Sequence, residues 1–338
     1  MPLQVPLTLR ALDFAAAAQR IKGTVKRTPL AQLARQLHPA LAAHPKAQSR
    51  LAAVELYFKL ECLQETGSFK SRGAWNQISQ LTDEERARGV VTTSSGNHGR
   101  ALSWAAARAG VPATICMPAD AYPNKIQACR DLGATVRLGD TRPETDAICT
   151  QLAKEGAVLV HPYDALRTIE GAGTVGLEIA EDLPEVDLVI APVGGGGLIS
   201  GTALALREKL GDRVRIIGVE PKGAATLSRG LEAGAPVDIA DIQTNVQGLC
   251  PLNVGALNIA AAQAAVDQVV ELEDEHIFAA QALLVNHADL VVEPAGAATL
   301  AAFLFTDLID KLDVQKVALI VSGGNPAPEQ LQAIRNLS

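Results

Sequence analysis

The interpretation of the whole chain depends on the stretch Ser68-Phe69-Lys70-Ser71-Arg72-Gly73-Ala74. Its lysine stands between a short polar loop and an amphipathic segment, and the spacing predicts a helix over residues 70–81 with Gly67 and Ser68 as loop and cap. Such a lysine has two interpretations. It is either a solvated side chain that opens a surface helix, or a covalent lysine that holds a carbonyl cofactor as a Schiff base.

The composition bounds the class of protein. The 338 residues carry a net charge of −7 without a basic run, which argues against nucleic acid as a partner. No stretch approaches the ~20 uninterrupted apolar residues of a membrane span, and residues 1–10 lack a signal-peptide pattern. The five cysteines are widely spaced and form no C-x-x-C motif. We therefore expect reduced thiols and a cytoplasmic location.

Apolar, strand-like runs alternate with helical segments along most of the chain. Predicted strands cover residues 54–60, 90–93, 113–117, 135–138, 157–160, 188–191, 216–219, 269–272 and 317–321. Predicted helices lie between them, as at residues 97–109, 124–132, 143–154, 173–181 and 294–304. Continuous apolar strands that alternate with helices are typical of parallel sheets covered on both faces, so we predict an α/β fold with two lobes. Residues 38–51, rich in Ala, Pro and polar residues, are expected to form a surface excursion.

Three polar, glycine-containing loops follow predicted strands, at the edge where open α/β sheets bind ligands. They are Thr-Ser-Ser-Gly-Asn-His-Gly at residues 93–99, Gly-Gly-Gly-Gly-Leu at 194–198 and Ser-Gly-Gly-Asn at 322–325. The four glycines at a helix start favour a phosphate, because several backbone N–H groups can face it. They match neither nucleotide-binding glycine motif. The other two loops, taken alone, also suit ordinary turns and caps.

Together these stretches resemble the fold-type II pyridoxal-phosphate (PLP) enzymes, and within them the serine/threonine dehydratase and serine racemase family. The likeness runs from about residue 21 to residue 325, in the family's order. The motifs that carry it are Lys59-Leu60-Glu61, the stretch at 68–74, the loops at 94–98, 194–198 and 322–325, Gly218-Val219-Glu220-Pro221 and Glu293-Pro294. The resemblance implies a two-lobed, tryptophan synthase β-like fold. Residues 1–82 and 167–338 would form a large PLP-binding domain, and residues 83–166 a small α/β domain.

The resemblance also implies a role for each motif residue. Lys70 would form the Schiff base and move the Cα proton, and Ser95 would act as the second acid–base group in a racemase. Asn97 would bond the ring's 3-hydroxyl and Ser322 its pyridine nitrogen. Cofactor contacts are further implied for Phe69, Lys70, Gly194, Gly195, Gly196, Gly197 and Leu198. Substrate contacts are implied for Ser94, Ser95, Gly96, His98 and Tyr163.

The activity implied is β-elimination, in which threonine or serine loses its β-hydroxyl and yields a 2-oxo acid and ammonia. A racemase is the alternative, and a non-catalytic PLP-binding protein is a third interpretation. The chain departs from its relatives at Tyr163, Glu170 and Gln247. These departures leave open another β-hydroxy amino acid as substrate, such as 3-hydroxyaspartate or phenylserine.

The resemblance also raises the questions of a bound metal, a regulatory domain and an oligomer. Metal-using relatives place Glu, a backbone carbonyl and Asp after the Gly-Val-Glu-Pro motif. Glu220 and Ala224 match, but Thr226 replaces the Asp, so a divalent cation such as Mg²⁺ or Ca²⁺ stays an open question. We expect no C-terminal regulatory domain, because the chain ends at Ser338 just past the catalytic part. The resemblance further implies a homodimer or tetramer that binds a small amino acid.

Overall fold

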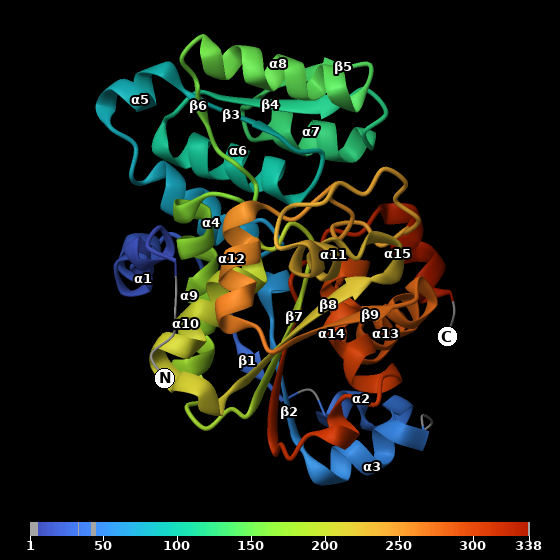
Figure 1. Cartoon of the computed structure of the whole chain (residues 1–338). Coiled ribbons are helices and arrows are strands. Elements are labelled where there is room, and N and C mark those ends of the chain that lie inside the picture. The colour runs from blue at the N-terminus through green and yellow to red at the C-terminus, as the bar shows by residue number, and fades with distance from the viewer. Residues whose placement is uncertain (1–5, 33, 42–44, 337–338) are drawn as a thin grey trace.

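Two β-sheets organise the computed structural model, which describes residues 6–32, 34–41 and 45–336. The larger sheet has six strands in the order β1-β2-β10-β7-β8-β9, and the smaller has four in the order β5-β4-β3-β6. The smaller sheet and its helices form the upper part of Figure 1, and the larger sheet runs through the lower part. The prediction of mostly parallel sheets covered by helices is confirmed.

The larger sheet is parallel except at one edge. Its strands are β1 (Leu30–Ala31), β2 (Glu55–Lys59), β7 (Leu188–Pro192), β8 (Arg215–Pro221), β9 (Gln268–Leu272) and β10 (Lys316–Ile320). Among them β1 alone is antiparallel to its neighbour. Every residue of the central strand β7 is buried, because helices cover both faces of the sheet.

The smaller sheet is parallel throughout. It contains β3 (Val90–Thr93), β4 (Ala113–Pro118), β5 (Thr135–Gly139) and β6 (Val158–Leu159). Its helices are α5 (Asp83–Arg88), α6 (Asn97–Ala109), α7 (Pro123–Asp131) and α8 (Arg142–Lys154). Local signals set their ends: Thr82 and Glu85 form a capping box before α5, and Gly110 ends α6 with a φ of 66°.

Helices of 8 to 17 residues pack around the larger sheet. They are α1 (Phe14–Ile21), α4 (Lys70–Ile78), α9 (Leu166–Asp182), α10 (Gly197–Leu210), α11 (Thr226–Ala233), α12 (Ala256–Ala265), α13 (Asp274–His287), α14 (Pro294–Phe305) and α15 (Pro328–Arg335). Helices α9 and α10 pack closely through glycines: a Cβ on Gly201 would lie 2.2 Å from the carbonyl oxygen of Ile169. Helix α9 begins at Leu166, seven residues before the predicted helix at 173–181. The added residues include Gly171, and glycine by itself disfavours a helix. The close packing against α10 explains why the helix extends through them.

The predicted surface excursion at residues 38–51 is wrong. The chain forms α2 (Ala34–Leu41) and α3 (Pro45–Ala53), and Leu37, Leu41 and Ala47 are fully buried. Arg50 is also buried, and its guanidinium binds carbonyl oxygens of Phe303 and Leu304 at the end of α14. The Leu37–Leu41 spacing of four residues is helical, but the surrounding Ala, Pro and polar residues obscure it. Residues 42–44 of this segment lie outside the described residues.

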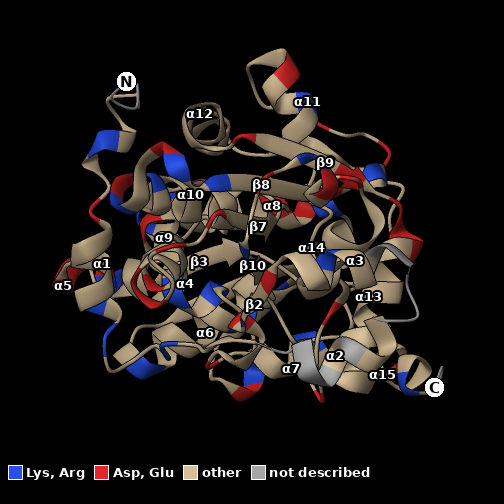
Figure 2. Cartoon of the chain, turned by 90° about the horizontal axis from the view of Figure 1, so that it is seen from below, with Lys and Arg blue, Asp and Glu red and all other residues tan. Residues whose placement is uncertain are grey.

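The structure shows neither a basic cluster nor a membrane-spanning helix in the described ranges. Lys and Arg positions are interspersed with Asp and Glu positions along the elements in Figure 2. None of the helices in the described ranges combines the length and apolar character that crossing a membrane requires.

Candidate active site

A cavity of about 420 Å³ lies where the loops after β3, β7 and β10 meet. The residues predicted from the sequence make up 14 of the 30 described residues that line it. Every residue for which a cofactor or substrate contact is predicted lines it: Phe69, Lys70, Ser94, Ser95, Gly96, Asn97, His98, Tyr163, Gly194, Gly195, Gly196, Gly197, Leu198 and Ser322. They converge because parallel strands end at one edge of a sheet and their loops share that edge.

Lys70 is the first residue of α4 and projects into the cavity wall. Its Nζ donates a 2.7 Å hydrogen bond to the carbonyl oxygen of Pro162 and lies 4.9 Å from the centre of the Phe69 ring. Burial lowers the pKa of Lys70 to about 8, although the nearby Glu293 opposes the shift. A substantial fraction of the amine is therefore neutral near physiological pH, as a nucleophile or general base must be.

The four-glycine loop joins β7 to the N-terminus of α10 and has no room for side chains. A Cβ on Gly195 would lie 2.2 Å from the Tyr163 ring, and Gly196 has a φ of 91°. Asn258 fixes the loop, because its Nδ2 donates to the carbonyl oxygens of Gly195 at 2.9 Å and Tyr163 at 3.1 Å. The amides of residues 194–198 donate to no other backbone group in the described ranges. Those amides and the helix N-terminus make a site for a phosphate group.

The loop after β3 presents hydroxyl and amide groups at the start of α6. The Ser94 hydroxyl accepts hydrogen bonds from the amides of Gly96 at 3.3 Å and Gly99 at 3.2 Å. Asn97 Nδ2 donates to Glu293 Oε1 at 2.6 Å. Across the cavity wall, Ser322 is buried and its hydroxyl donates to the carbonyl oxygen of Ala295 at 3.3 Å. The site thus offers neutral polar groups, an amide and a hydroxyl, on two sides.

His98 is held as a neutral imidazole. Its Nε2 lies 3.1 Å from the carbonyl oxygen of Val160, and a carbonyl only accepts, so we assign the hydrogen to Nε2. Burial and the charge of Lys70 lower the pKa of His98 to about 3. Its buried Nδ1 has no partner among the described residues. Nδ1 is therefore an acceptor without a donor in the described ranges, enclosed by protein atoms, whereas a carboxylate ligand would need the amide donors at the start of α6.

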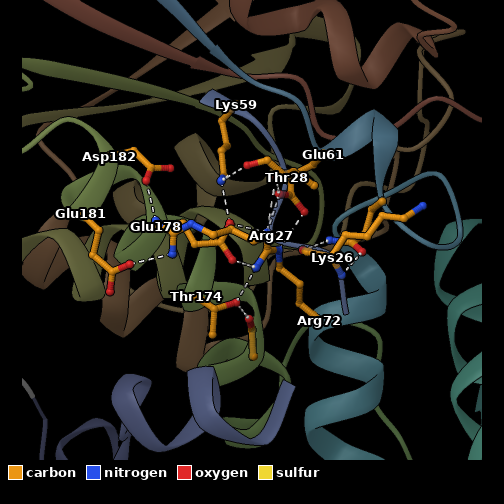
Figure 3. Close-up of polar contacts among 12 residues, drawn as sticks. Lys26, Arg27, Thr28, Lys59, Glu61, Arg72, Thr174, Glu178, Glu181 and Asp182 are labelled. Atoms are coloured by element: carbon orange, nitrogen blue, oxygen red, sulfur yellow. Dashed lines mark hydrogen bonds and ion pairs between the residues drawn. The ribbon is translucent and has the colours of Figure 1, made fainter. Parts of the chain in front are cut away.

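A buried network of charged side chains surrounds Arg72 (Figure 3). Arg72, two residues after Lys70, makes two hydrogen bonds to Glu61 and two to Glu178, each between 2.7 and 2.8 Å. Lys59 Nζ adds a 2.6 Å contact to Glu178, and Thr28 donates to Glu61. Two cations and two anions thus balance in a water-poor interior, where an unpaired charge is costly. The network anchors the helix that carries Lys70.

Several residues of the cavity wall are not predicted from the sequence to contact cofactor or substrate. Asp120, Lys125, Arg142, Gln247 and Glu293 also line the cavity, and of these the sequence singles out Gln247 as a departure and Glu293 only within a motif. Asp120 and Arg142 follow the ends of β4 and β5, and that position is the one signal that could have found them. The supporting role of Asn258 has no sequence signal, because it lies within a helix about sixty residues from the loop it holds.

Glu170 lies away from the cavity, which overturns its link to substrate choice. Its carboxylate accepts from the Asp13 amide at 2.9 Å, from Asn76 Nδ2 at 2.9 Å and from Arg20. The side chain therefore ties α1 and α4 to α9. Its departure from the family pattern has a structural explanation and says nothing about the substrate.

Glu220 caps a helix. Oε1 accepts from the Leu227 amide at 2.6 Å, and Oε2 accepts from the Ser228 amide at 3.0 Å and the Ser228 hydroxyl at 2.9 Å. The first turn of α11 thus engages both carboxylate oxygens, and Ala224 lies buried beside it. Within the described ranges no three His, Cys, Asp or Glu side chains cluster as a metal site would require.

These features suit the groups of PLP. The glycine loop can hold a phosphate, and Lys70 offers an amine to an aldehyde. The Asn97 amide can donate to an oxygen on the ring, and the Ser322 hydroxyl can face a neutral pyridine nitrogen. Each requirement is met by a residue of the same cavity.

Comparison with known proteins also points to a PLP enzyme. The pattern of the family described as "Pyridoxal-phosphate dependent enzyme" matches residues 21–323. The L-threonine ammonia-lyase of Thermotoga maritima is 39% identical over 96% of this chain and 77% of that protein. The serine racemase of Dictyostelium discoideum is 36% identical over 97% of this chain and 98% of that protein. The structure of maize serine racemase has a TM-score of 0.86 and 35% identity, and it covers 96% of each chain. The chain therefore belongs to the family of pyridoxal-phosphate-dependent enzymes, of fold type II.

Proposed function

We propose that the protein is a PLP-dependent ammonia-lyase that acts on a small β-hydroxy amino acid, with L-threonine and L-serine as the first candidates. The observation that carries this proposal is that Lys70, the glycine loop, Asn97 and Ser322 line one cavity. The similar L-threonine ammonia-lyases of Thermotoga maritima and Geobacter sulfurreducens, 39% and 38% identical, support the substrate class.

The chain's own groups suit this chemistry. When bound, PLP withdraws electrons from the Cα of an attached amino acid and so makes its proton acidic. Lys70, with its pKa lowered to about 8 by burial, is placed to take that proton. The neutral Ser322 hydroxyl gives the ring nitrogen a partner that leaves it unprotonated, which favours rapid loss of a β-hydroxyl. The Cα proton and the β-hydroxyl together leave as water, and the dehydrated amino acid that remains then takes up water and yields a 2-oxo acid and ammonia.

Serine racemization is the second candidate. It is favoured by Ser95, which lines the same cavity as Lys70 and could return a proton to Cα. The 36% identical serine racemase of Dictyostelium discoideum supports it as well. In a racemase both residues exchange protons with Cα, whereas a lyase needs only one of them.

A panel of β-hydroxy amino acids tests the proposal. Purified holoenzyme is incubated with L-threonine, L-serine, 3-hydroxyaspartate and phenylserine, and 2-oxo acid release is measured with a coupled dehydrogenase. We expect release from L-threonine or L-serine. D-Serine that forms faster than pyruvate would make racemization the main activity. Absence of any 2-oxo acid, with no D-serine, would leave a non-catalytic PLP-binding protein.

We also propose a homo-oligomer in the cytoplasm. The five cysteines are free thiols, and four of them are buried, which suits a reducing compartment. Leu63 and Val291 are 45% and 42% exposed, and Gly324 lies near both the Val291 carbonyl and Cys62, the residue before Leu63. Exposed apolar side chains grouped in this way suit a subunit contact. Light scattering of the purified protein measures the assembly. The domain boundaries at residues 83 and 166 stay a prediction.

A further inference from the structure

We propose that Glu293 is a positioning residue, which fixes the amide of Asn97 so that it presents an N–H group to PLP. The inference rests on the proposed function only in that PLP occupies the cavity. It does not depend on which amino acid is the substrate.

The orientation of the Asn97 amide is set from both ends. Its Nδ2 donates to Glu293 Oε1 at 2.6 Å, and its Oδ1 accepts from Asn325 Nδ2 at 2.8 Å. A flipped amide would place oxygen against the Glu293 carboxylate and N–H against N–H at Asn325. Burial raises the pKa of Glu293 to about 7, so above that pH its carboxylate is ionised. Both contacts would then be repulsive, and this orientation follows from the network.

Asn325 is oriented in its turn. Its Oδ1 accepts from Arg100 Nη1 at 2.6 Å, and its Nδ2 also donates to the Thr66 carbonyl oxygen at 2.9 Å. The chain of hydrogen bonds therefore runs from the Arg100 cation through two amides to the Glu293 carboxylate. Consecutive bonds of one polarity strengthen one another, and the charged ends give the chain its direction.

Glu293 is placed for this role and not for capping its own helix. It is the N-cap residue of α14, yet its side chain accepts no bond from that helix, as an N-cap side chain ordinarily does. It is 5% exposed. Gly323 leaves the space it needs, since a Cβ there would lie 2.2 Å from Glu293 Oε1.

One hydrogen of Asn97 Nδ2 is left over once Glu293 has taken the other. Asn97 lines the cavity, and because its oxygen faces Asn325, this hydrogen is the group that it offers to a bound ring. A donor of this kind favours an anionic oxygen on the ring. Without Glu293 the amide could rotate and meet the ring as an acceptor instead.

A double-mutant cycle tests whether Glu293 acts through Asn97. The apparent dissociation constant of PLP is measured by absorbance at pH 8 for the wild type, Glu293→Leu, Asn97→Ala and the double variant. We expect Glu293→Leu to weaken PLP binding about tenfold, the equivalent of one hydrogen bond. In the Asn97→Ala background the same change should have less than about a twofold effect. Glu293→Gln keeps an acceptor oxygen and should restore most of the affinity.

Two outcomes would overturn the inference. One is an equal loss of PLP affinity from Glu293→Leu in both backgrounds, which would show that Glu293 acts independently of Asn97. The other is no loss in the wild-type background. Thermal melting of the apoproteins shows separately whether each variant folds. If Glu293→Leu does not fold, the cycle is run with Glu293→Gln. Any loss of PLP affinity in that variant must again vanish in the Asn97→Ala background. No substrate is added, so an error in the proposed lyase activity leaves the result interpretable.

Discussion

Arg72 and Glu61 form a fully buried ion pair with two hydrogen bonds, from Nε to Oε2 and from Nη2 to Oε1, each 2.8 Å long. Burial alone would raise the pKa of Glu61, but the Arg72 guanidinium and Lys59 lower it below the ordinary value. Arg72 follows Lys70 by two residues in the same helix. The position of the amine therefore depends on a balance of charges that water does not reach.

Breaking this pair should destabilise the whole protein. Arg72→Met leaves Glu61 and Glu178 with too little positive charge in the interior, and we expect the free energy of unfolding to fall by about 3–5 kcal/mol. Urea unfolding of the apoprotein measures it. The matched control is Arg27→Ala, because Arg27 pairs with Glu181 at the surface, where the two side chains are 49% and 57% exposed. That variant should lose at most about 1 kcal/mol, and similar losses in the two variants would contradict the argument.

Much of the fold could be predicted from local sequence, and the family resemblance led to 14 of the 30 described residues that line the cavity. The strand at residues 90–93 and the helix at 97–109 have the predicted bounds, because a β-branched run and a glycine stop are local signals. The roles of Asn258, Glu293 and Arg100 could not be predicted in this way. Each acts through a contact with a residue that is distant in sequence, and hydrogen bonds of this kind exist only once the fold has brought their partners together. The interpretation of Glu170 fails for the same reason.

The covalent lysine can be separated from its neighbour in the cavity. Lys70 and Lys125 both line the wall, but the Lys125 amine donates to Gln247 at 3.1 Å and lies over the Tyr122 ring. After borohydride treatment and digestion, mass spectrometry should find the reduced adduct on Lys70 in the wild type and in Lys125→Ala. Lys70→Ala should carry none. A reducible adduct retained in Lys70→Ala would show that the assignment is wrong.

Replacing Ser322 tests the neutral partner of the ring. An aspartate at this position would hold a proton on the pyridine nitrogen, and we expect elimination to slow by at least about tenfold, the equivalent of 1.4 kcal/mol in the barrier. The absorbance spectrum of the bound cofactor should change as well. Ser322→Ala is the control, since it removes the hydroxyl without adding charge and should have the smaller effect. Unchanged turnover and spectrum in Ser322→Asp would remove Ser322 from contact with the cofactor.

Glu220 should contribute to stability without a metal. The α11 amides occupy both carboxylate oxygens, so we expect EDTA to leave the melting temperature and the activity unchanged. Glu220→Ala removes the cap and leaves buried amides unpaired, with an expected loss of about 1–3 kcal/mol. A fall in melting temperature on chelation, reversed by Mg²⁺ or Ca²⁺, would show that the residue serves a cation.

The pKa of Lys70 predicts how the apoenzyme takes up PLP. An aldehyde reacts with the neutral amine, and burial lowers the pKa of Lys70 to about 8. Below that pH the neutral fraction falls about tenfold per pH unit, because each step down protonates most of what remains. Stopped-flow absorbance should therefore show the rate of covalent uptake rising with pH and levelling off above about 8. A midpoint near the ordinary lysine value of about 10.4 would mean that the amine is solvated in the apoenzyme. Glu293→Gln removes the charge that opposes this shift, so it should move the midpoint lower, and a midpoint that rises would contradict the assigned electrostatics.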